Sequence, residues 1–170
     1  MFQAAPTLET PRLRLRAFRL EDFEPFAALH ASLRSIYVDG PKPRAAAWTE
    51  FAAAAGRWAL VGYGAWTIER KSDAEPVGLV SLNYPEPAPE RELGWMLWEA
   101  FEGAGYATEA AARAKAFAFE DLGWDVMVSY IDPGNTASIK VAERLGAVLD
   151  PDAPKPDNDP ALVYRHRRPA

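Results

Sequence analysis

Two glycines that precede a helical pattern mark a candidate site for a phosphorylated ligand. Residues 102–107 read Glu-Gly-Ala-Gly-Tyr-Ala, and apolar residues then recur at helical spacing as far as Leu122. Glycine lets the backbone approach a ligand closely, and the free N–H groups of a first helical turn carry partial positive charge. The stretch therefore indicates a pyrophosphate site built mainly from backbone atoms, although a tight turn without any ligand would need the same glycines. The N–H groups of this site belong to Gly103, Ala104, Gly105, Tyr106, Ala107 and Thr108.

A second candidate lies at residues 132–138, Asp-Pro-Gly-Asn-Thr-Ala-Ser, where a predicted strand meets a predicted helix. Asn135 suits the N-cap of a helix over residues 136–145, and Ser138 would then be its N3 residue. Gly146 suits the C′ position that ends the same helix. Capping alone would explain Asn135 and Ser138, so a functional role for either needs a further argument.

Hydrophobic periodicity predicts the elements that hold these residues. Strands are predicted at residues 12–18, 63–69, 77–84, 91–98, 126–131, 147–149 and 162–167. Helices are predicted at residues 21–33, 44–59, 107–122 and 136–145. Short turns join the strands between residues 63 and 98, which should form an antiparallel meander, whereas a helix joins strands 91–98 and 126–131, which should be parallel. The fold class is α+β with a mixed sheet, in a single domain spanning residues 1–170, with 162–167 as a last edge strand.

Four positions of the N-terminal half carry a charge or a titratable ring without an obvious site. Arg12, Arg14 and Arg16 alternate with apolar residues, so we expect a solvated strand face rather than an anion site. His30 lies on helix 21–33 with no second His or acid at ligand spacing, and we expect it to be structural or exposed.

The composition excludes several classes of protein. Hydrophobic residues make up 49% of the 170 residues, which is incompatible with a disordered chain. The absence of Cys excludes disulfides, Cys-ligated zinc and a cysteine nucleophile, and we expect no metal site. A net charge of −5 disfavours nucleic acid as a partner and mildly favours a cationic substrate. We see no membrane span and no signal peptide, and we expect a cytoplasmic protein.

Four short motifs together carry a family resemblance. They are Glu-Leu-Gly-Trp at 92–95, Gly-Ala-Gly-Tyr-Ala-Thr-Glu-Ala at 103–110, Asn-Thr-Ala-Ser at 135–138, and a helix closing at Leu-Gly-Ala. The combination resembles the GNAT superfamily of acetyl-CoA-dependent N-acetyltransferases. With the opening LETPRLRLRAFRLEDFEPF, the chain looks like the RimJ/RimL ribosomal-protein N-terminal acetyltransferase branch, and the likeness runs from Leu8 to about Arg167.

This resemblance implies acetyl-CoA as co-substrate, a GNAT-like acyltransferase fold and an amine acceptor, either a protein N-terminus or a small molecule; a homodimer stays open. The family's phosphate turn reads Gln/Arg-x-x-Gly-x-Gly/Ala. Its last two fixed positions match at Gly105 and Ala107, whereas Glu102 stands where Gln or Arg is usual. An acid beside a pyrophosphate is unfavourable unless it points away, so a side-chain role for Glu102 is in doubt while the backbone site is not.

The resemblance also assigns roles near the reacting atoms. The strand 91–98 would be splayed by a bulge at Gly94, and its residues Trp95, Met96 and Leu97 would pair with the pantetheine arm. Glu92 is the only acid inside that strand and would take the amine's proton, directly or through water, unless it is a salt-bridged surface residue. The family branch has an Asn-x-x-Ser, matched by Asn135 on the pantetheine arm and Ser138 on the thiol. No Gly-x-Ser-x-Gly elbow is present, so we expect direct attack rather than an acyl-enzyme.

Two alternatives remain at this point. One is a dinucleotide-binding βαβ unit, with Gly103, Gly105 and Thr108 at the GxGxxG positions; Thr108 replaces the glycine that this fold needs for close packing. The other is a non-catalytic acyl-CoA-binding module that keeps the fold without turnover.

Overall fold

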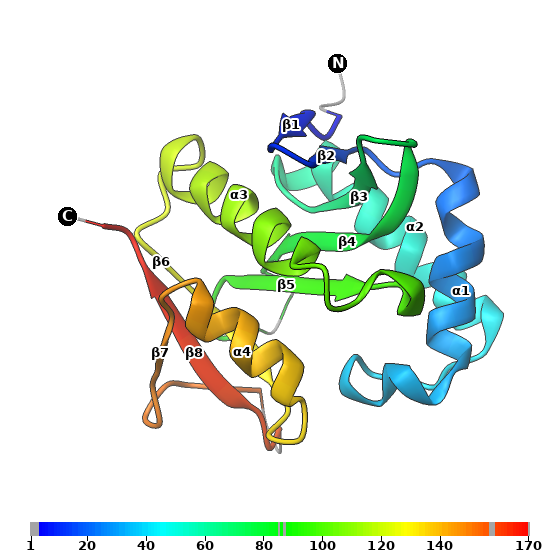
Figure 1. Ribbon diagram of the computed structural model, residues 1–170. Coiled ribbons are helices and arrows are strands. Elements are labelled where there is room, and N and C mark those ends of the chain that lie inside the picture. The colour runs from blue at the N-terminus through cyan, green and yellow to red at the C-terminus, as the bar shows by residue number, and fades with distance from the viewer. Residues whose placement is uncertain (1–3, 85, 87, 157–158, 170) are drawn as a thin grey trace.

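The computed structural model describes residues 4–84, 86, 88–156 and 159–169, and within them eight strands form one mixed sheet (Figure 1). The order across the sheet is β1-β2-β3-β4-β5-β6-β8-β7. The strands are β1 (Leu8–Glu9), β2 (Leu13–Arg16), β3 (Ala65–Arg70), β4 (Glu75–Asn83), β5 (Glu92–Leu97), β6 (Val126–Ile131), β7 (Val148–Leu149) and β8 (Leu162–Arg167). Strand β1 was not predicted from the sequence, because its two residues are too few to show a periodicity.

The described helices occupy the predicted places, with ends shifted by a few residues. They are α1 (Phe23–Ala31), α2 (Arg44–Val61), α3 (Tyr106–Glu120) and α4 (Thr136–Arg144), with the short 3-10 helices η1 (Leu20–Asp22), η2 (Leu33–Tyr37) and η3 (Glu99–Phe101). Asn135 caps α4 as predicted, its side chain accepting from the Ser138 N–H at 3.1 Å. Gly146 follows the helix with a φ of +77°, the left-handed conformation that glycine adopts without strain.

The strand pairing confirms the antiparallel meander β3-β4-β5 and the parallel pair β5-β6. Two details were predicted wrongly. Strand β5 pairs with β4 in continuous register from Glu92 to Leu97, so there is no bulge at Gly94. Strand β8 is not an edge strand, because β7 pairs with its outer side.

The parallel pair β5-β6 separates almost as soon as it forms. Its only residue pair is Glu92 with Val128, and beyond this pair the two strands diverge. We call the gap beyond Glu92 and Val128 the strand opening.

Helices cover both faces of the sheet. The helices α3 and α4 lie on one face, where Leu93 and Val80 pack against small residues of α3 such as Ala110 (Figure 1). The opposite face of the same strands carries Leu79 and Trp98, which pack in a second core cluster with Phe26 of α1 and Phe51 of α2. The strict alternation of strand 91–98 thus gives each face its own helices.

The expected solvated arginine face is only partly correct. Arg16 is 6% exposed and donates to both Asp22 and Glu69, which are themselves buried. This triad ties β2 and β3 to η1, and loss of Arg16 would leave the buried Asp22 carboxylate without a cation at a cost of about 3–5 kcal/mol. The strand is covered here because Asp22 of η1 folds back onto Arg16, which periodicity alone does not reveal.

His30 was expected to be either structural or exposed, and the structure shows that it is structural. It is fully buried, its Nδ1 lies 3.0 Å from the Phe26 carbonyl oxygen, and its ring stacks on Phe26 with centroids 4.1 Å apart.

Candidate functional site

A pocket of about 230 Å³ passes through the strand opening and reaches both faces of the sheet. On the α1/α2 face it is lined by Leu79, Ser81, Asn83, Glu92, Gly94 and Met96. At the opening and on the α3/α4 face it is lined by Leu93, Trp95, Ser129, Tyr130, Ile131, Asp132, Asn135 and Ser138. Tyr37 and Val38, from the segment that ends η2, close one side. Two molecules could therefore meet in it from opposite faces.

Glu92 sits at the narrow end of the opening. Burial raises the pKa of its carboxyl to about 7, against opposing hydrogen bonds from the Asn83 side chain and the Tyr130 N–H and the charge of Arg57. Such a group exchanges a proton near neutral pH, which is the property required of an acid–base residue. The surface salt bridge considered for Glu92 does not describe this environment.

Asn83 holds Glu92 in place and is itself held by Arg57. The Arg57 Nη1 donates to Asn83 Oδ1 at 2.5 Å, and Asn83 Nδ2 donates to Ser81 Oγ at 2.9 Å. Because arginine can only donate, it fixes which end of the amide is oxygen and turns the amide N–H groups toward Glu92. Ser81 and Asn83 were missed by sequence reasoning, since nothing local marks a residue on β4 that lies opposite Glu92 and Gly94.

The first turn of α4 forms the other wall of the pocket. Asn135 uses Oδ1 for the cap, which leaves its Nδ2 free to donate. Ser138 lies one turn further along and also lines the pocket. Tyr37 lies against the loop that precedes α4, since a β-carbon placed on Gly134 would lie 3.1 Å from the Tyr37 hydroxyl. Tyr37 therefore closes the pocket against this turn.

The backbone N–H and C=O groups of β5 point alternately toward its two neighbouring strands, β4 and β6. Val128 N–H donates to the Arg91 carbonyl at 2.8 Å, and Trp98 N–H donates to Val77 of β4 at 2.9 Å. Odd-numbered residues therefore direct their backbone groups toward β6 and even-numbered ones toward β4. Trp95 and Leu97 present backbone groups to the strand opening, while Met96 reaches the pocket through its side chain alone.

The predicted pyrophosphate turn lies outside the pocket lining, at the N-terminus of α3. Gly103 and Gly105 have φ values of +79° and +81°, and Gly105 is the N-cap. Glu109 N–H makes the first bond back along the helix, to the Gly105 carbonyl at 3.1 Å. The N–H groups before it have no intrahelical acceptor and point outward.

Two arginines surround this turn. Arg12 donates to the Ala104 carbonyl at 2.9 Å and lies over the Tyr106 ring, with its Cζ 4.8 Å from the centroid. Arg34 of η2 pairs with Glu102, so the carboxylate that departs from the family pattern has a cation beside it. Neither arginine could be assigned to the turn from the sequence, because both come from distant segments.

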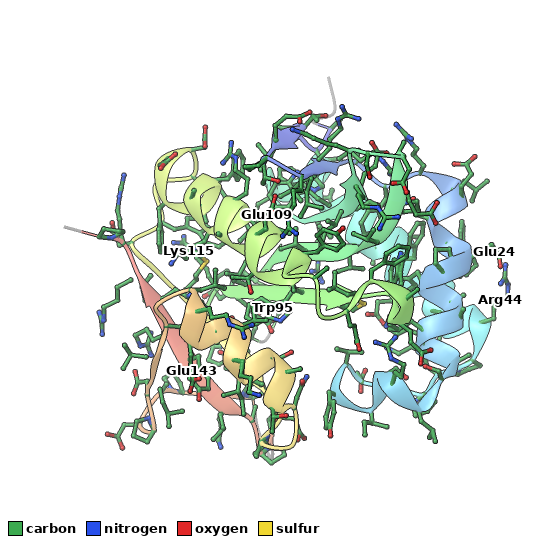
Figure 2. All side chains as sticks on the ribbon, viewed as in Figure 1. Glu24, Arg44, Trp95, Glu109, Lys115 and Glu143 are labelled. Carbon is green, nitrogen blue, oxygen red and sulfur yellow. The ribbon has the colours of Figure 1, made fainter. Side chains whose placement is uncertain are left out.

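The structure thus brings five of the predicted site residues into one pocket: Glu92, Trp95, Met96, Asn135 and Ser138. Leu97 and residues 103–108 lie beside it rather than in its lining. Figure 2 shows Trp95 between α3 and α4, and its side chain packs against the core clusters beneath both helices.

Comparison with known proteins identifies the family of the chain. Residues 12–148 match the acetyltransferase (GNAT) domain family. The chain belongs to the GNAT acetyltransferase family. Membership supports acyl transfer as the general chemistry and confirms the predicted fold class. It excludes the dinucleotide-binding alternative, as does the largely antiparallel sheet of this GNAT protein.

Individual relatives differ in how similar they are to this chain. An acetyltransferase from Agrobacterium tumefaciens str. C58 has a crystal structure with a TM-score of 0.92 and 40% identity, covering 99% of this chain and 98% of that one. YkkB of Bacillus subtilis (strain 168) is 34% identical over 110 residues, which are 62% of this chain and 63% of YkkB, less than two thirds of its length.

A structure of RimL, a ribosomal L7/L12 alpha-N-protein acetyltransferase in complex with coenzyme A, has a TM-score of 0.75, covering 95% of this chain and 98% of that one. At 19% identity this likeness concerns the fold alone, and the RimJ/RimL branch stays a prediction.

The described residues contain no helix that is both long and apolar enough to cross a membrane, and no group of three or more His, Asp or Glu side chains that could hold a metal ion.

Proposed function

We propose that this protein transfers the acetyl group of acetyl-CoA to a primary amine by direct attack within a ternary complex. The observation that carries the proposal is the pocket that passes through the strand opening, with Glu92 toward one face and the first turn of α4 toward the other. Acetyl-CoA would enter from the α3/α4 face and the amine from the α1/α2 face, so the thioester and the amine would meet inside the sheet.

The cofactor would be held mainly by backbone groups. Its pyrophosphate would lie on the N–H groups of Gly103 to Thr108, supported by the helix dipole of α3. Its pantetheine arm would pair with the backbone of Trp95 and Leu97 in the strand opening and accept a hydrogen bond from Asn135 Nδ2. The same β5 donors would stabilise the oxyanion that develops on the thioester carbonyl.

Proton transfer would involve two side chains on opposite sides of the reacting carbon. An ammonium acceptor gives a proton to Glu92, directly or through water, and the free amine attacks the carbonyl carbon. The new C–N bond forms and the C–S bond breaks. The proton that the new amide nitrogen gives up goes to the departing thiolate, to which Ser138 donates a hydrogen bond. Acids line the pocket at Glu92 and Asp132, and no Lys or Arg is among its described lining residues, which suits a cationic acceptor.

The acceptor would be a protein N-terminus, as in the RimJ/RimL branch, or a small-molecule amine, and the acetyl-CoA pool that such an enzyme draws on is expected in the cytoplasm. The test is a screen of N-terminal peptides and small amines that measures CoA thiol released from acetyl-CoA. Turnover with at least one amine is expected. Tight acetyl-CoA binding without turnover on any acceptor would instead identify a non-catalytic acyl-CoA-binding module.

A further inference from the structure

The strand opening begins at a definite point in the hydrogen-bond ladder. Bonds between parallel strands are evenly spaced, each one two residues beyond the last. Because Val128 N–H donates to the Arg91 carbonyl, the next bond would run from Tyr130 N–H to the Leu93 carbonyl. That bond is not made, although both strands continue.

The Leu93 carbonyl, which would have accepted that bond, accepts one from a side chain instead. The Ser129 hydroxyl donates to the Leu93 carbonyl at 2.7 Å. The Tyr130 N–H lies near the Glu92 carboxyl, whose pKa it lowers against the larger effect of burial. Ser129 comes from β6 on the α3/α4 face, so its hydroxyl takes the place of the Tyr130 N–H as the donor to the Leu93 carbonyl. Burying the Leu93 carbonyl without a partner would be costly, and the Ser129 hydroxyl satisfies it at the point where the strands part inside the core.

The Ser129 hydroxyl is held in turn by His166 of β8. The His166 Nε2 lies 3.0 Å from Ser129 Oγ, and His166 is 1% exposed. Since the hydroxyl proton is committed to a carbonyl that can only accept, the imidazole must carry its hydrogen on Nε2 and donate to the oxygen. Burial, with the charge of Lys115 nearby, lowers the pKa of His166 to about 4 and keeps the ring neutral. Its Nδ1 has no hydrogen-bond partner within the part of the chain that the structure describes.

We propose that Ser129 and His166 are positioning residues that hold open the sheet for the pantetheine arm of acetyl-CoA. His166 orients the Ser129 hydroxyl, Ser129 takes the Leu93 carbonyl out of the ladder, and the backbone of Trp95 beyond it stays available to the cofactor. This role rests on the proposed function, because it assumes that acetyl-CoA binds in the strand opening.

A serine touching a histidine at a pocket also raises the question of a covalent nucleophile. The geometry argues against it, because the Ser129 proton points to the Leu93 carbonyl rather than to the imidazole, and no third group orients His166 through Nδ1. Neither residue was singled out by the sequence, since they lie 37 positions apart and only the pairing of β6 with β8 brings them together.

The test compares parent, Ser129→Ala, His166→Leu, His166→Gln and the double variant Ser129→Ala/His166→Leu, by calorimetric acetyl-CoA affinity and by thermal unfolding. The first two substitutions should each weaken binding about tenfold, the upper range of one lost neutral hydrogen bond. His166→Gln keeps an N–H near the position of Nε2 and should restore most of the affinity. The double variant should bind no more weakly than Ser129→Ala, because both residues act through one hydroxyl.

His30→Leu is the matched control, because it removes the chain's other histidine, which is also fully buried but stacks on Phe26 of α1 and lies 3.7 Å from Glu50 of α2. It should lower the melting temperature and leave acetyl-CoA affinity at the parent value. Equal loss of affinity in His30→Leu would overturn the proposal by showing a general effect of core damage. So would parent-like affinity in Ser129→Ala.

A second measurement does not depend on the cofactor. Without ligand, Ser129→Ala should speed amide hydrogen exchange in residues 92–97 and 126–131 but not in α2, since β5 and β6 lose a link; unchanged exchange would overturn the role of Ser129. An acetyl group found on Ser129 after incubation with acetyl-CoA alone would replace positioning by nucleophilic catalysis. Failure of the parent to turn over any amine, with these effects intact, would contradict the proposed function and not the role of Ser129.

Discussion

The two ends of the proposed cofactor site are built in opposite ways. The turn before α3 is made of consecutive residues whose φ values and free N–H groups come from two glycines and a helix N-terminus. The strand opening is made by side chains of β4, β5, β6, β8 and α2 that the chain brings together from as far apart as Arg57 and His166. The first end tolerates many side chains because its backbone does the binding. The second depends on individual hydrogen bonds, so single substitutions there should act more specifically.

The largest effect should come from Glu92→Gln, at the strand opening. Glutamine keeps the shape and can still face Tyr130 N–H, but it cannot accept the amine's proton, so turnover should fall by about 10²-fold or more with little change in acetyl-CoA affinity. Steady-state kinetics with a competent amine would measure it, and Glu120→Gln, an exposed acid at the end of α3, is the control. Parent-like kinetic constants would make Glu92 a structural residue only.

The same residue gives a prediction for pH. Because Glu92 must be ionised to act as a base, kcat/KM should rise with pH through about 7, and this limb should vanish in Glu92→Gln. The contribution of Glu92 to the free energy of unfolding changes with pH in the opposite direction to kcat/KM. The folded-state pKa lies above the unfolded value of 4.5, so the folded chain binds the extra proton, and this contribution is complete below pH 4.5 and lost as the pH rises through 7. Urea unfolding of parent and variant across this range would measure it, and a pH-independent difference between them would contradict it.

The next effect tests the backbone end. Gly105→Val should weaken acetyl-CoA binding by an order of magnitude or more, because a branched side chain blocks the pyrophosphate and the φ of +81° becomes strained. Gly123→Val is a matched control, since Gly123 has a φ of +67° and open space around it but lies at the far end of α3. Both variants should lose stability, and only Gly105→Val should lose affinity. Unchanged affinity in folded Gly105→Val would remove the pyrophosphate from this turn.

Asn135→Asp separates capping from binding at the α4 wall. Aspartate caps as well as asparagine, so stability should be kept, but it cannot donate, and acetyl-CoA affinity should fall by up to about tenfold. Asn135→Ala should in addition cost about 1 kcal/mol of stability. Calorimetric affinity and thermal melts distinguish them; parent-like affinity in Asn135→Asp would leave position 135 as a cap and nothing more.

The smallest effect is expected for Ser138→Ala. Its hydrogen bond matters most as the thiolate departs, so turnover should slow by a few fold to about tenfold while acetyl-CoA affinity is unchanged. Single-turnover kinetics would isolate this step. Parent-like turnover would assign thiolate protonation to water or to another group.

The contrast between the two ends of the cofactor site also explains how much of the fold and the site could be predicted from the sequence. The turn at 102–107, the cap at Asn135 and the alternation along β5 are local patterns, and each could be predicted from neighbouring residues. The burial of Arg16 against Glu69, the contact of Arg57 with Asn83 and that of His166 with Ser129 depend on strand register, which no local pattern specifies. The bulge predicted at Gly94 was wrong for the same reason: β5 stays in regular register with β4, and the Leu93 carbonyl bonds to the Ser129 hydroxyl of β6 instead of to its backbone.

The strand opening has a consequence for cooperativity. The sheet has two blocks, one made of β1 to β5 and the other of β6, β8 and β7. The two blocks share a single parallel residue pair, Glu92 with Val128. A pantetheine arm lying along β5 would supply amide groups where a neighbouring strand would otherwise lie, so the cofactor would act as the missing part of the ladder. Folding and cofactor binding would then draw on the same backbone bonds, and acetyl-CoA at a hundredfold excess over its Kd would add about 2.7 kcal/mol to the free energy of unfolding. The substrate would thus join the two blocks of the sheet while the reaction proceeds and release them when CoA leaves.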